Sequence, residues 1–182
     1  MSDRTPLLVL GLGNVLLEDD GVGAAAVALL RDRYEAPPGV LVLDGGTLGL
    51  ALLPYLQSAG NVILVDAIQT GEPAGSLVHV QDDDVGPAVA TRLSPHQVGV
   101  ADLLDAARWL DRYPQHVVLL GLVPDSMELA VGLSPLVRPG LPALVDSIVS
   151  EAAAMGFAFR LRSAHEPAAG GSVDVARLSG VC

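Results

Sequence analysis

Two aspartates and one histidine stand at positions where their side chains can do chemistry. Asp20 closes an acidic triplet after a glycine-rich turn, Asp66 follows an apolar run directly, and His96 lies at the second position of a predicted helix. Two carboxylates and one imidazole suit a borderline divalent ion such as zinc, nickel, cobalt or iron. The two aspartates can equally form an acid–base pair without a metal. Spacing alone leaves both interpretations open.

Each candidate residue also has an ordinary structural explanation. The helix dipole favours acidic residues in a first turn by about 0.3–1 kcal/mol each, and aspartates commonly begin turns. Asn14 and Asp44 are further cleft candidates, because they too follow predicted strands. The positive end of a helix favours the neutral form of His96, which is the form that binds metal. The functional interpretation therefore depends on the combination of residues.

Other catalytic motifs are missing or incomplete in the sequence. It contains no His-Glu-x-x-His and no Gly-x-Ser-x-Gly pattern, which argues against the commoner zinc proteases and serine hydrolases. The turn Gly11–Asn14 resembles the start of a dinucleotide-binding fingerprint, but Leu16 stands where the third glycine belongs. The acidic residues before the next helix would also repel a pyrophosphate. An NAD-binding protein is an alternative, with Asp44 as the candidate ribose contact.

Strands and helices that alternate along the chain must position these residues. Short, nearly continuous apolar runs are typical of strands buried on both faces, and apolar residues at helical spacing lie between them. We expect a three-layer α/β/α sandwich around a mostly parallel twisted sheet with one antiparallel edge strand. Ligands of such folds bind outside the carboxyl ends of the strands, where the candidate residues lie. The expected strands are Leu7–Leu12, Val40–Leu43, Val62–Val65, Val117–Val123, the edge strand Gly75–Val80 and a last one within Phe157–Leu161; the expected helices are Asp20–Tyr34, Leu48–Ala59, Pro95–Tyr113 and Leu141–Met155.

The composition is that of one folded domain. Hydrophobic residues make up 51% of the 182 residues and charged residues 17%, so a sizeable core can form. We expect a single α/β domain over residues 1–162. Residues 163–182 turn to Ala, Gly, Ser and isolated charges, which predicts a flexible tail.

The charge balance excludes several classes of partner. All ten basic residues are arginines, and 21 acidic residues give a net charge of −11. Such a surface repels phosphate groups, so neither nucleic acid nor an anionic membrane is an expected partner. The N-terminus lacks a basic segment, and the uncharged stretch 45–65 contains Pro54 and polar residues, so we expect neither a signal peptide nor a membrane span. The single cysteine, Cys182, fits a reduced, cytoplasmic location.

Four motifs, in this order, resemble those of the nickel–iron hydrogenase maturation endopeptidases. They are Gly11–Gly23, Asp44–Thr47, Asp66–Ala67 and Ser94–Gly99, and the similarity covers roughly residues 6–162. The resemblance implies a cytoplasmic protease that removes a short C-terminal extension from the hydrogenase large-subunit precursor after nickel insertion. It also implies that Asp20, Asp66 and His96 contact the metal and form the catalytic set. Glu18 is not part of the family's pattern and receives no role.

The resemblance leaves the mechanism open. We expect the nickel to arrive on cysteines of the precursor, with the three side chains completing its coordination; other divalent ions can occupy the same site. Either a metal-held water attacks the peptide bond, or an aspartate acts as general base, since the family is also classed as aspartic-type. An alternative from another class is a non-enzymatic module that senses nickel loading without cutting. We expect a monomer, because no long apolar edge or heptad pattern is present.

Overall fold

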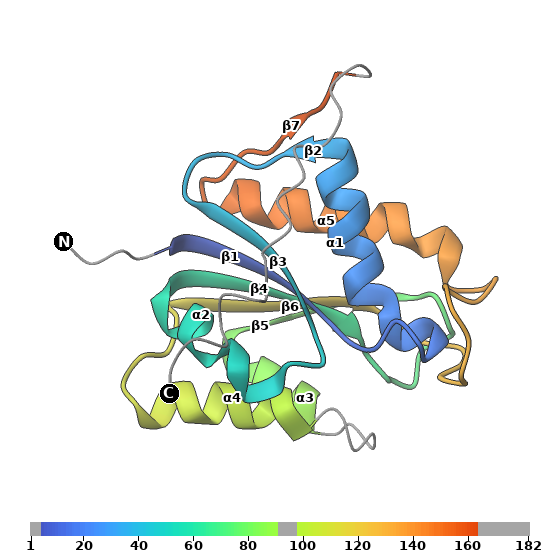
Figure 1. Cartoon of the computed structure of the whole chain (residues 1–182), viewed down its shortest axis with the longest axis horizontal. Helices are drawn as coiled ribbons and strands as arrows, with labels where there is room; N and C mark the ends of the chain where they lie inside the picture. The colour runs from blue at the N-terminus through green and yellow to red at the C-terminus, as the bar shows by residue number, and fades with distance from the viewer. Residues whose placement is uncertain (1–4, 91–97, 164–182) are drawn as a thin grey trace, which may run out of the picture.

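A five-stranded sheet forms the centre of the computed structural model, which describes residues 5–90 and 98–163 (Figure 1). In spatial order its strands are β3 (Val40–Gly46), β1 (Thr5–Leu12), β4 (Ala59–Ala67), β6 (His116–Leu122) and β5 (Leu77–Gln81). The strand β5 runs antiparallel to β6 at one edge, and the other neighbouring pairs are parallel. This confirms the predicted sheet with its antiparallel edge strand.

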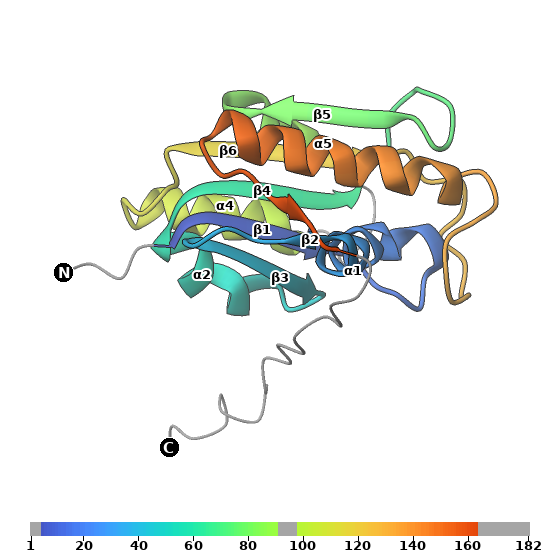
Figure 2. The same cartoon turned by 90° about the horizontal axis from the view of Figure 1, so that it is seen from above.

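Helices cover both faces of the sheet, as Figures 1 and 2 show. One face carries α1 (Val22–Arg33) and α5 (Leu141–Ala154); the other carries α2 (Leu53–Ser58), α3 (Val85–Ala90) and α4 (Val98–Trp109). Successive side chains of β1 alternate between the two layers, because the side chains of a strand point to opposite faces in turn. Leu8 and Leu10 join the α4 side of the core, whereas Leu7 and Val9 join the α1 side. The predicted three-layer sandwich is therefore confirmed.

Several elements differ from their predicted bounds. The expected helix over residues 48–59 is a 3-10 turn, η2 (Gly49–Leu52), followed by α2, because Pro54 suits the first turn of a helix and not its interior. The expected last strand shrinks to β7 (Arg160–Leu161), which pairs with β2 (Tyr34–Glu35) and lies outside the main sheet.

Three of the fold predictions made from the sequence are not tested by this structure. The predicted start of α4 at residues 94–97, and all but the first residue of the predicted tail 163–182, lie outside the described residues. The single domain over 1–162 also stays a prediction.

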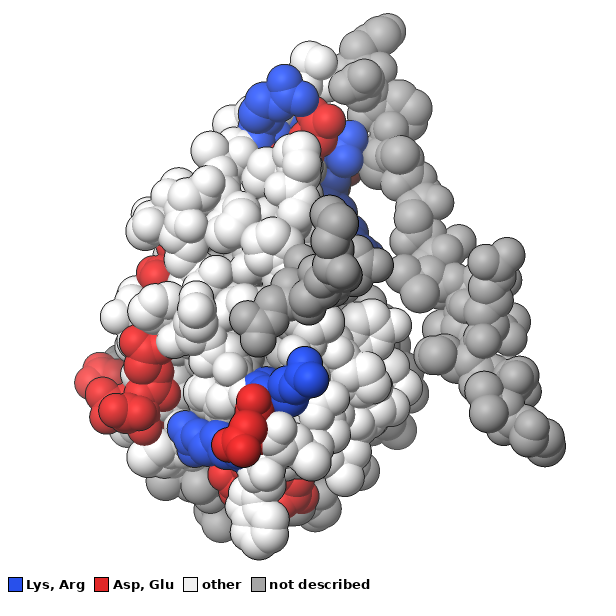
Figure 3. Space-filling model, turned by 90° about the vertical axis from the view of Figure 1, so that its left-hand side faces the viewer, with Lys and Arg blue, Asp and Glu red and all other residues white. Residues whose placement is uncertain are grey.

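The surface at the amino ends of the parallel strands is drawn in Figure 3. Acidic side chains gather in one group on this face, and arginines and further acidic residues are scattered over the remainder. The exposed acidic turn η3 (Asp82–Asp84) follows β5. In the described part of the chain, no helix has the length and apolar character needed to cross a membrane.

Glycines allow α1 to lie directly on the sheet. A Cβ atom added at Gly23, in the first turn of α1, would lie 2.3 Å from the carbonyl oxygens of both Leu12 and Val65. A Cβ at Gly11 would lie 2.5 Å from the carbonyl oxygen of Gly23. Backbone atoms cannot yield as a flexible side chain does, so these glycines fix the distance between the start of α1 and the ends of β1 and β4. The glycine-rich turn therefore serves helix–strand packing.

Replacing Gly23 with alanine is expected to destabilise the fold. Alanine favours a helix over glycine by about 1 kcal/mol, but the added methyl group must push α1 off the sheet, and overpacking of this kind costs roughly 1–3 kcal/mol or more. We expect Gly23→Ala to lower the free energy of unfolding in urea. Gly71→Ala is the matched control, because a Cβ there would meet no atom within 4 Å. Equal stability of the two variants would contradict the prediction.

Candidate active site

A cavity lies where the carboxyl ends of three parallel strands meet, and two of the candidate residues line it. Its walls are Leu12, Gly13, Asp20, Gly46, Thr47, Gly49, Leu52, Asp66, Val100 and Leu103. Leu12 ends β1, Gly46 ends β3, and Asp66 is the penultimate residue of β4. The cavity therefore occupies the position at which α/β folds of this kind bind their ligands.

Asp66 is fixed by its strand. It lies inside β4, opposite Gly121 of β6, and is only 2% exposed. Its Oδ1 accepts a hydrogen bond of 2.7 Å from the backbone N–H of Ala67. The approach of β6 is so close that a Cβ at Gly121 would lie 2.0 Å from the carbonyl oxygen of Asp66. The backbone that carries this carboxylate is thus held by its pairing with β6.

Asp20 lines the same cavity, but it comes from the segment between β1 and α1. It belongs to the 3-10 turn η1 (Glu18–Gly21) before α1 and is 3% exposed. Its Oδ2 accepts a hydrogen bond of 2.8 Å from the backbone N–H of Asn14. Gly13 separates the two aspartates: a Cβ there would lie 1.7 Å from the carbonyl oxygen of Asp20 and 3.6 Å from Oδ1 of Asp66. With a φ of +108°, this position also favours glycine for its backbone conformation.

The two further cleft candidates have local roles in turns. The side chain of Asn14 accepts a hydrogen bond of 3.0 Å from the N–H of Leu16, and its own N–H holds Asp20. Asp44 is exposed, and its Oδ1 accepts a hydrogen bond of 3.1 Å from the N–H of Gly46. Neither residue is among those that line the cavity, and Asp44 lines a neighbouring groove instead.

His96 lies outside the described residues, so the structure does not place it. Within residues 5–90 and 98–163, no three His, Cys, Asp or Glu side chains come together as a metal site. The helix α4 begins at Val98, and Val100 and Leu103 on it line the cavity. The start of α4 therefore lies at the cavity, close in sequence to His96.

Asp19 has a structural role that sequence reasoning missed. Its side chain is fully buried, and its Oδ1 accepts a hydrogen bond of 2.8 Å from the N–H of Ser134. Its Oδ2 accepts two more, of 3.0 Å from the N–H of Asp125 and 3.1 Å from that of Ser126. One carboxylate thus gathers the two ends of a loop that follows β6. Nothing in the local sequence separates Asp19 from Asp20, because its partners lie more than 100 positions away.

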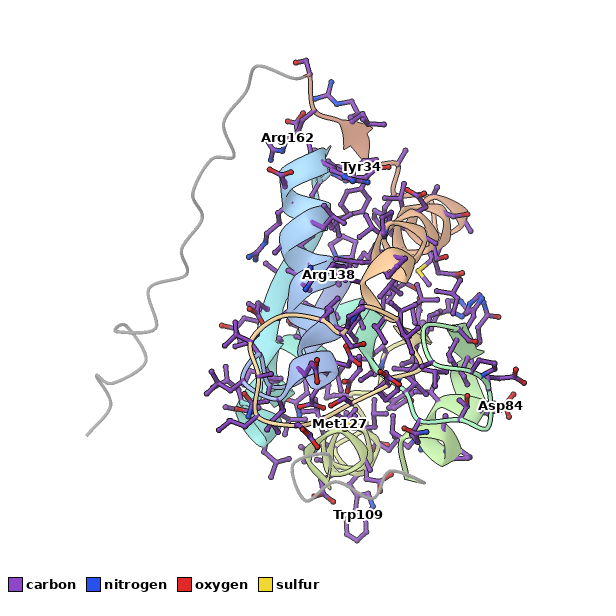
Figure 4. All side chains as sticks on the ribbon, turned by 90° about the vertical axis from the view of Figure 1, so that its right-hand side faces the viewer. Tyr34, Asp84, Trp109, Met127, Arg138 and Arg162 are labelled. Atoms are coloured by element: carbon purple, nitrogen blue, oxygen red, sulfur yellow. The ribbon has the colours of Figure 1, made fainter. Side chains whose placement is uncertain are left out.

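Backbone hydrogen bonds join the same two segments. The N–H of Glu18 donates to the carbonyl of Ala130 at 2.9 Å, and the N–H of Ala130 donates to the carbonyl of Leu16 at 3.1 Å. Figure 4 looks onto this end of the molecule, where the loop with Met127 lies in front. The segment that carries Asp20 is therefore held by a second loop.

The arrangement suits the binding of a cation or the handling of a water molecule. Both carboxylates are buried, and the aliphatic walls of the cavity lower the local dielectric constant, which strengthens electrostatic interactions. Two carboxylates in such a place can bind a divalent ion, or one of them can take a proton from a water molecule.

Comparisons with known proteins agree with this fold. The model of the hydrogenase maturation protease family matches residues 24–151. The hydrogenase 2 maturation protease of Escherichia coli K12 is 36% identical over 145 residues, which cover 79% of this chain and 88% of that protein. The solved structure of the hydrogenase maturating endopeptidase HybD from E. coli has 34% identity and a TM-score of 0.83, and covers 86% of this chain and 98% of that one. The [NiFe] hydrogenase maturation protease HybD from Thermococcus kodakarensis has 27% identity and a TM-score of 0.67, and covers 81% of this chain and 99% of that one.

These matches define the class of the protein first: it is a peptidase, and so a hydrolase. The chain belongs to the hydrogenase maturation protease family. The resemblance seen in its four motifs is thereby confirmed.

Proposed function

We propose that this protein is the endopeptidase that removes a C-terminal extension from the nickel-loaded large-subunit precursor of a NiFe hydrogenase. The observation that carries the proposal is the pair Asp20 and Asp66, which line one cavity at the strand ends. Both side chains are buried, with exposed fractions of 3% and 2%. Membership of the family supports a hydrogenase precursor as the substrate. The Thermococcus relative is named as a [NiFe] hydrogenase maturation protease, which supports a NiFe hydrogenase in particular.

Recognition of the precursor depends on its nickel in this proposal. Asp20, Asp66 and His96 complete the coordination of an ion that the precursor carries on its own cysteines. The first support is the type of donor, since carboxylates and an imidazole suit nickel. The second is the position of α4: Val100 lines the cavity and is only four positions after His96 in the sequence. The chain has one cysteine, Cys182, so the thiolates have to come from the substrate. Other divalent ions can take the same three ligands.

Hydrolysis then follows one of two routes with the same balance of atoms. A water oxygen adds to the carbonyl carbon of the scissile bond, the C–N bond breaks, and the leaving nitrogen takes a proton. In the first route the precursor's nickel polarises the water or the carbonyl. In the second, Asp20 or Asp66 removes the proton from the water as general base, which is aspartic-type chemistry.

The setting of the reaction follows from the substrate. A precursor that carries nickel on free cysteines requires a reducing compartment, so we assign the enzyme to the cytoplasm. The acidic surface excludes nucleic acid as a second partner, and we assign a monomer as the active form.

The test uses the purified protein and the large-subunit precursor from the same genome, loaded with nickel or left free of it. We expect mass spectrometry to show loss of a C-terminal fragment from the nickel-loaded precursor, while the nickel-free precursor stays intact. The intact nickel-free sample is the control for contaminating proteases. Tight binding of the loaded precursor without any loss of mass would instead favour a nickel-sensing binding module and would overturn the proposal.

A further inference from the structure

An apolar groove runs beside the cavity on the other side of the turn η1. Three small residues of α1, Ala24, Ala25 and Ala28, contribute to its lining. The loop residues Val131–Leu133 and Leu141 at the start of α5 also line it. The volume of the groove is about 570 Å³. This lies within the range of whole ligand pockets, so the groove has room for several side chains of a bound segment and not for one alone.

The groove lies next to the candidate active site. Asp20 lines the cavity and Gly21, the next residue, lines the groove. At the end of β3, Gly46 lines the cavity and Asp44 lines the groove. The turn η1 and the end of β3 therefore form a shared wall. A chain whose scissile bond lies at the cavity enters the groove when it crosses this wall.

The character of the groove is that of a protein-binding surface. Its charged lining residues are Glu18, Asp44 and Arg138, and most of the lining is apolar. Figure 4 shows Arg138 between α1 and α5. Val131 in the groove is 84% exposed, and Leu129 beside it in the same loop is 83% exposed. Apolar side chains exposed together, with charged groups at the margin, are typical of sites that bind another protein.

The walls of the groove are preformed. Asp19 and the backbone of residues 16–18 hold the loop that carries Val131 through hydrogen bonds. The alanines are on a regular helix that is fixed to the sheet through Gly23. A preformed surface loses little conformational entropy on binding, which favours affinity for an extended, flexible partner.

We propose that this groove binds an extended segment of the precursor next to the scissile bond, through apolar side chains of that segment. The inference rests on the proposed function, since it takes the precursor as the substrate. Ala28 is exposed on α1, so a large side chain there fills the groove without entering the core. The groove adds affinity for this segment, whereas the cavity holds the nickel and the scissile bond.

The first test is the kinetics of precursor processing by Ala28→Trp. We expect KM to rise about 10-fold while kcat stays within about twofold, because uniform binding is lost and the reacting groups are untouched. Ala153→Trp, at an exposed position on α5, is the matched control, and Ala28→Ser, which keeps the groove open, should retain the wild-type KM. A KM for Ala28→Trp equal to that of Ala153→Trp would overturn the inference. Lack of processing by the wild-type protein would refute the proposed function instead.

The second test identifies what occupies the groove. Ala28→Cys on a Cys182→Ser background carries one thiol, to which a benzophenone photo-crosslinker is attached. With the nickel-loaded precursor present, we expect crosslinks to map to residues flanking its cleavage site. The inference would be overturned by crosslinks to a second copy of the protease or to its own residues 164–182. It would also be overturned if Ala28→Cys crosslinked to the precursor no more often than Ala153→Cys does.

Discussion

Asp66→Asn and Asp20→Asn are each expected to reduce processing of the precursor by about 1,000-fold or more, a loss in the range seen when a key electrostatic group of an active site is removed. Asparagine has the shape of aspartate without its charge. It cannot balance the charge of a metal ion as a carboxylate does, and it cannot accept a proton from water. The nickel route therefore fails in both variants, and the general-base route fails in the variant of the aspartate that takes the proton.

The substitution is chosen so that the fold survives. The amide oxygen of an asparagine at position 66 can still accept the hydrogen bond from the N–H of Ala67, and one at position 20 can still accept that from the N–H of Asn14. Asp105→Asn on α4, whose side chain is 66% exposed, is the matched control and should process at the wild-type rate. Urea unfolding of all three variants checks that each is folded. Wild-type processing by a folded Asp66→Asn or Asp20→Asn variant would refute the assigned site.

The same variants separate the two routes of catalysis. If the carboxylates are ligands of the precursor's nickel, each variant loses affinity for the nickel-loaded precursor as well as activity. If one of them is only a general base, its variant binds the loaded precursor normally and fails to cut it. A binding titration with the loaded precursor, beside the processing assay, measures both quantities.

The sequence predicted the sheet and its cavity well, because both depend on local patterns. Continuous apolar runs are visible wherever a strand is buried on both faces, and the rule that ligands bind at strand ends then selects Asp66 and Asp20. The same rule also selected Asp44, which is at the same edge but lines the neighbouring groove. The position of a residue at a strand end shows that it lies at the carboxyl ends of the strands. Whether its side chain enters the cavity or the neighbouring groove depends on packing.

Features that depend on distant contacts were not predictable. A strand was expected within Phe157–Leu161, but its pairing with β2 spans more than 120 positions, and β2 carries no apolar pattern of its own. The tight turn around Gly13 is explained by the carbonyl of Asp20 and the carboxylate of Asp66, which approach it only in the folded chain. The role of Asp19 depends on three N–H groups in a loop that follows β6.

Asp19→Ala is expected to cost roughly 3–5 kcal/mol of the free energy of unfolding. The fully buried carboxylate accepts three backbone hydrogen bonds, and removing it leaves three buried donors without this acceptor, each worth about 1–3 kcal/mol if it finds no substitute. Against a typical total of about 5–15 kcal/mol, this loss is large. Urea unfolding at constant pH measures it, with Asp32→Ala at an exposed position of α1 as the control.

Asp19→Asn should be almost as damaging, which distinguishes this position from Asp20 and Asp66. Both oxygens of Asp19 accept hydrogen bonds, so the NH2 group of an asparagine must face an N–H donor whichever way it is turned. A stability of Asp19→Asn close to wild type would contradict this assignment.

Because Asp19 holds the loop that carries Val131, partial loosening of this loop should also weaken the apolar groove before the fold is lost. At low urea, where Asp19→Asn is still folded, we therefore expect its KM for the precursor to rise and the amides of residues 125–134 to exchange hydrogen faster than in the wild type. Asp19 thus affects activity only through the loop and the binding of the substrate, whereas Asp20 lines the cavity in which the reaction takes place.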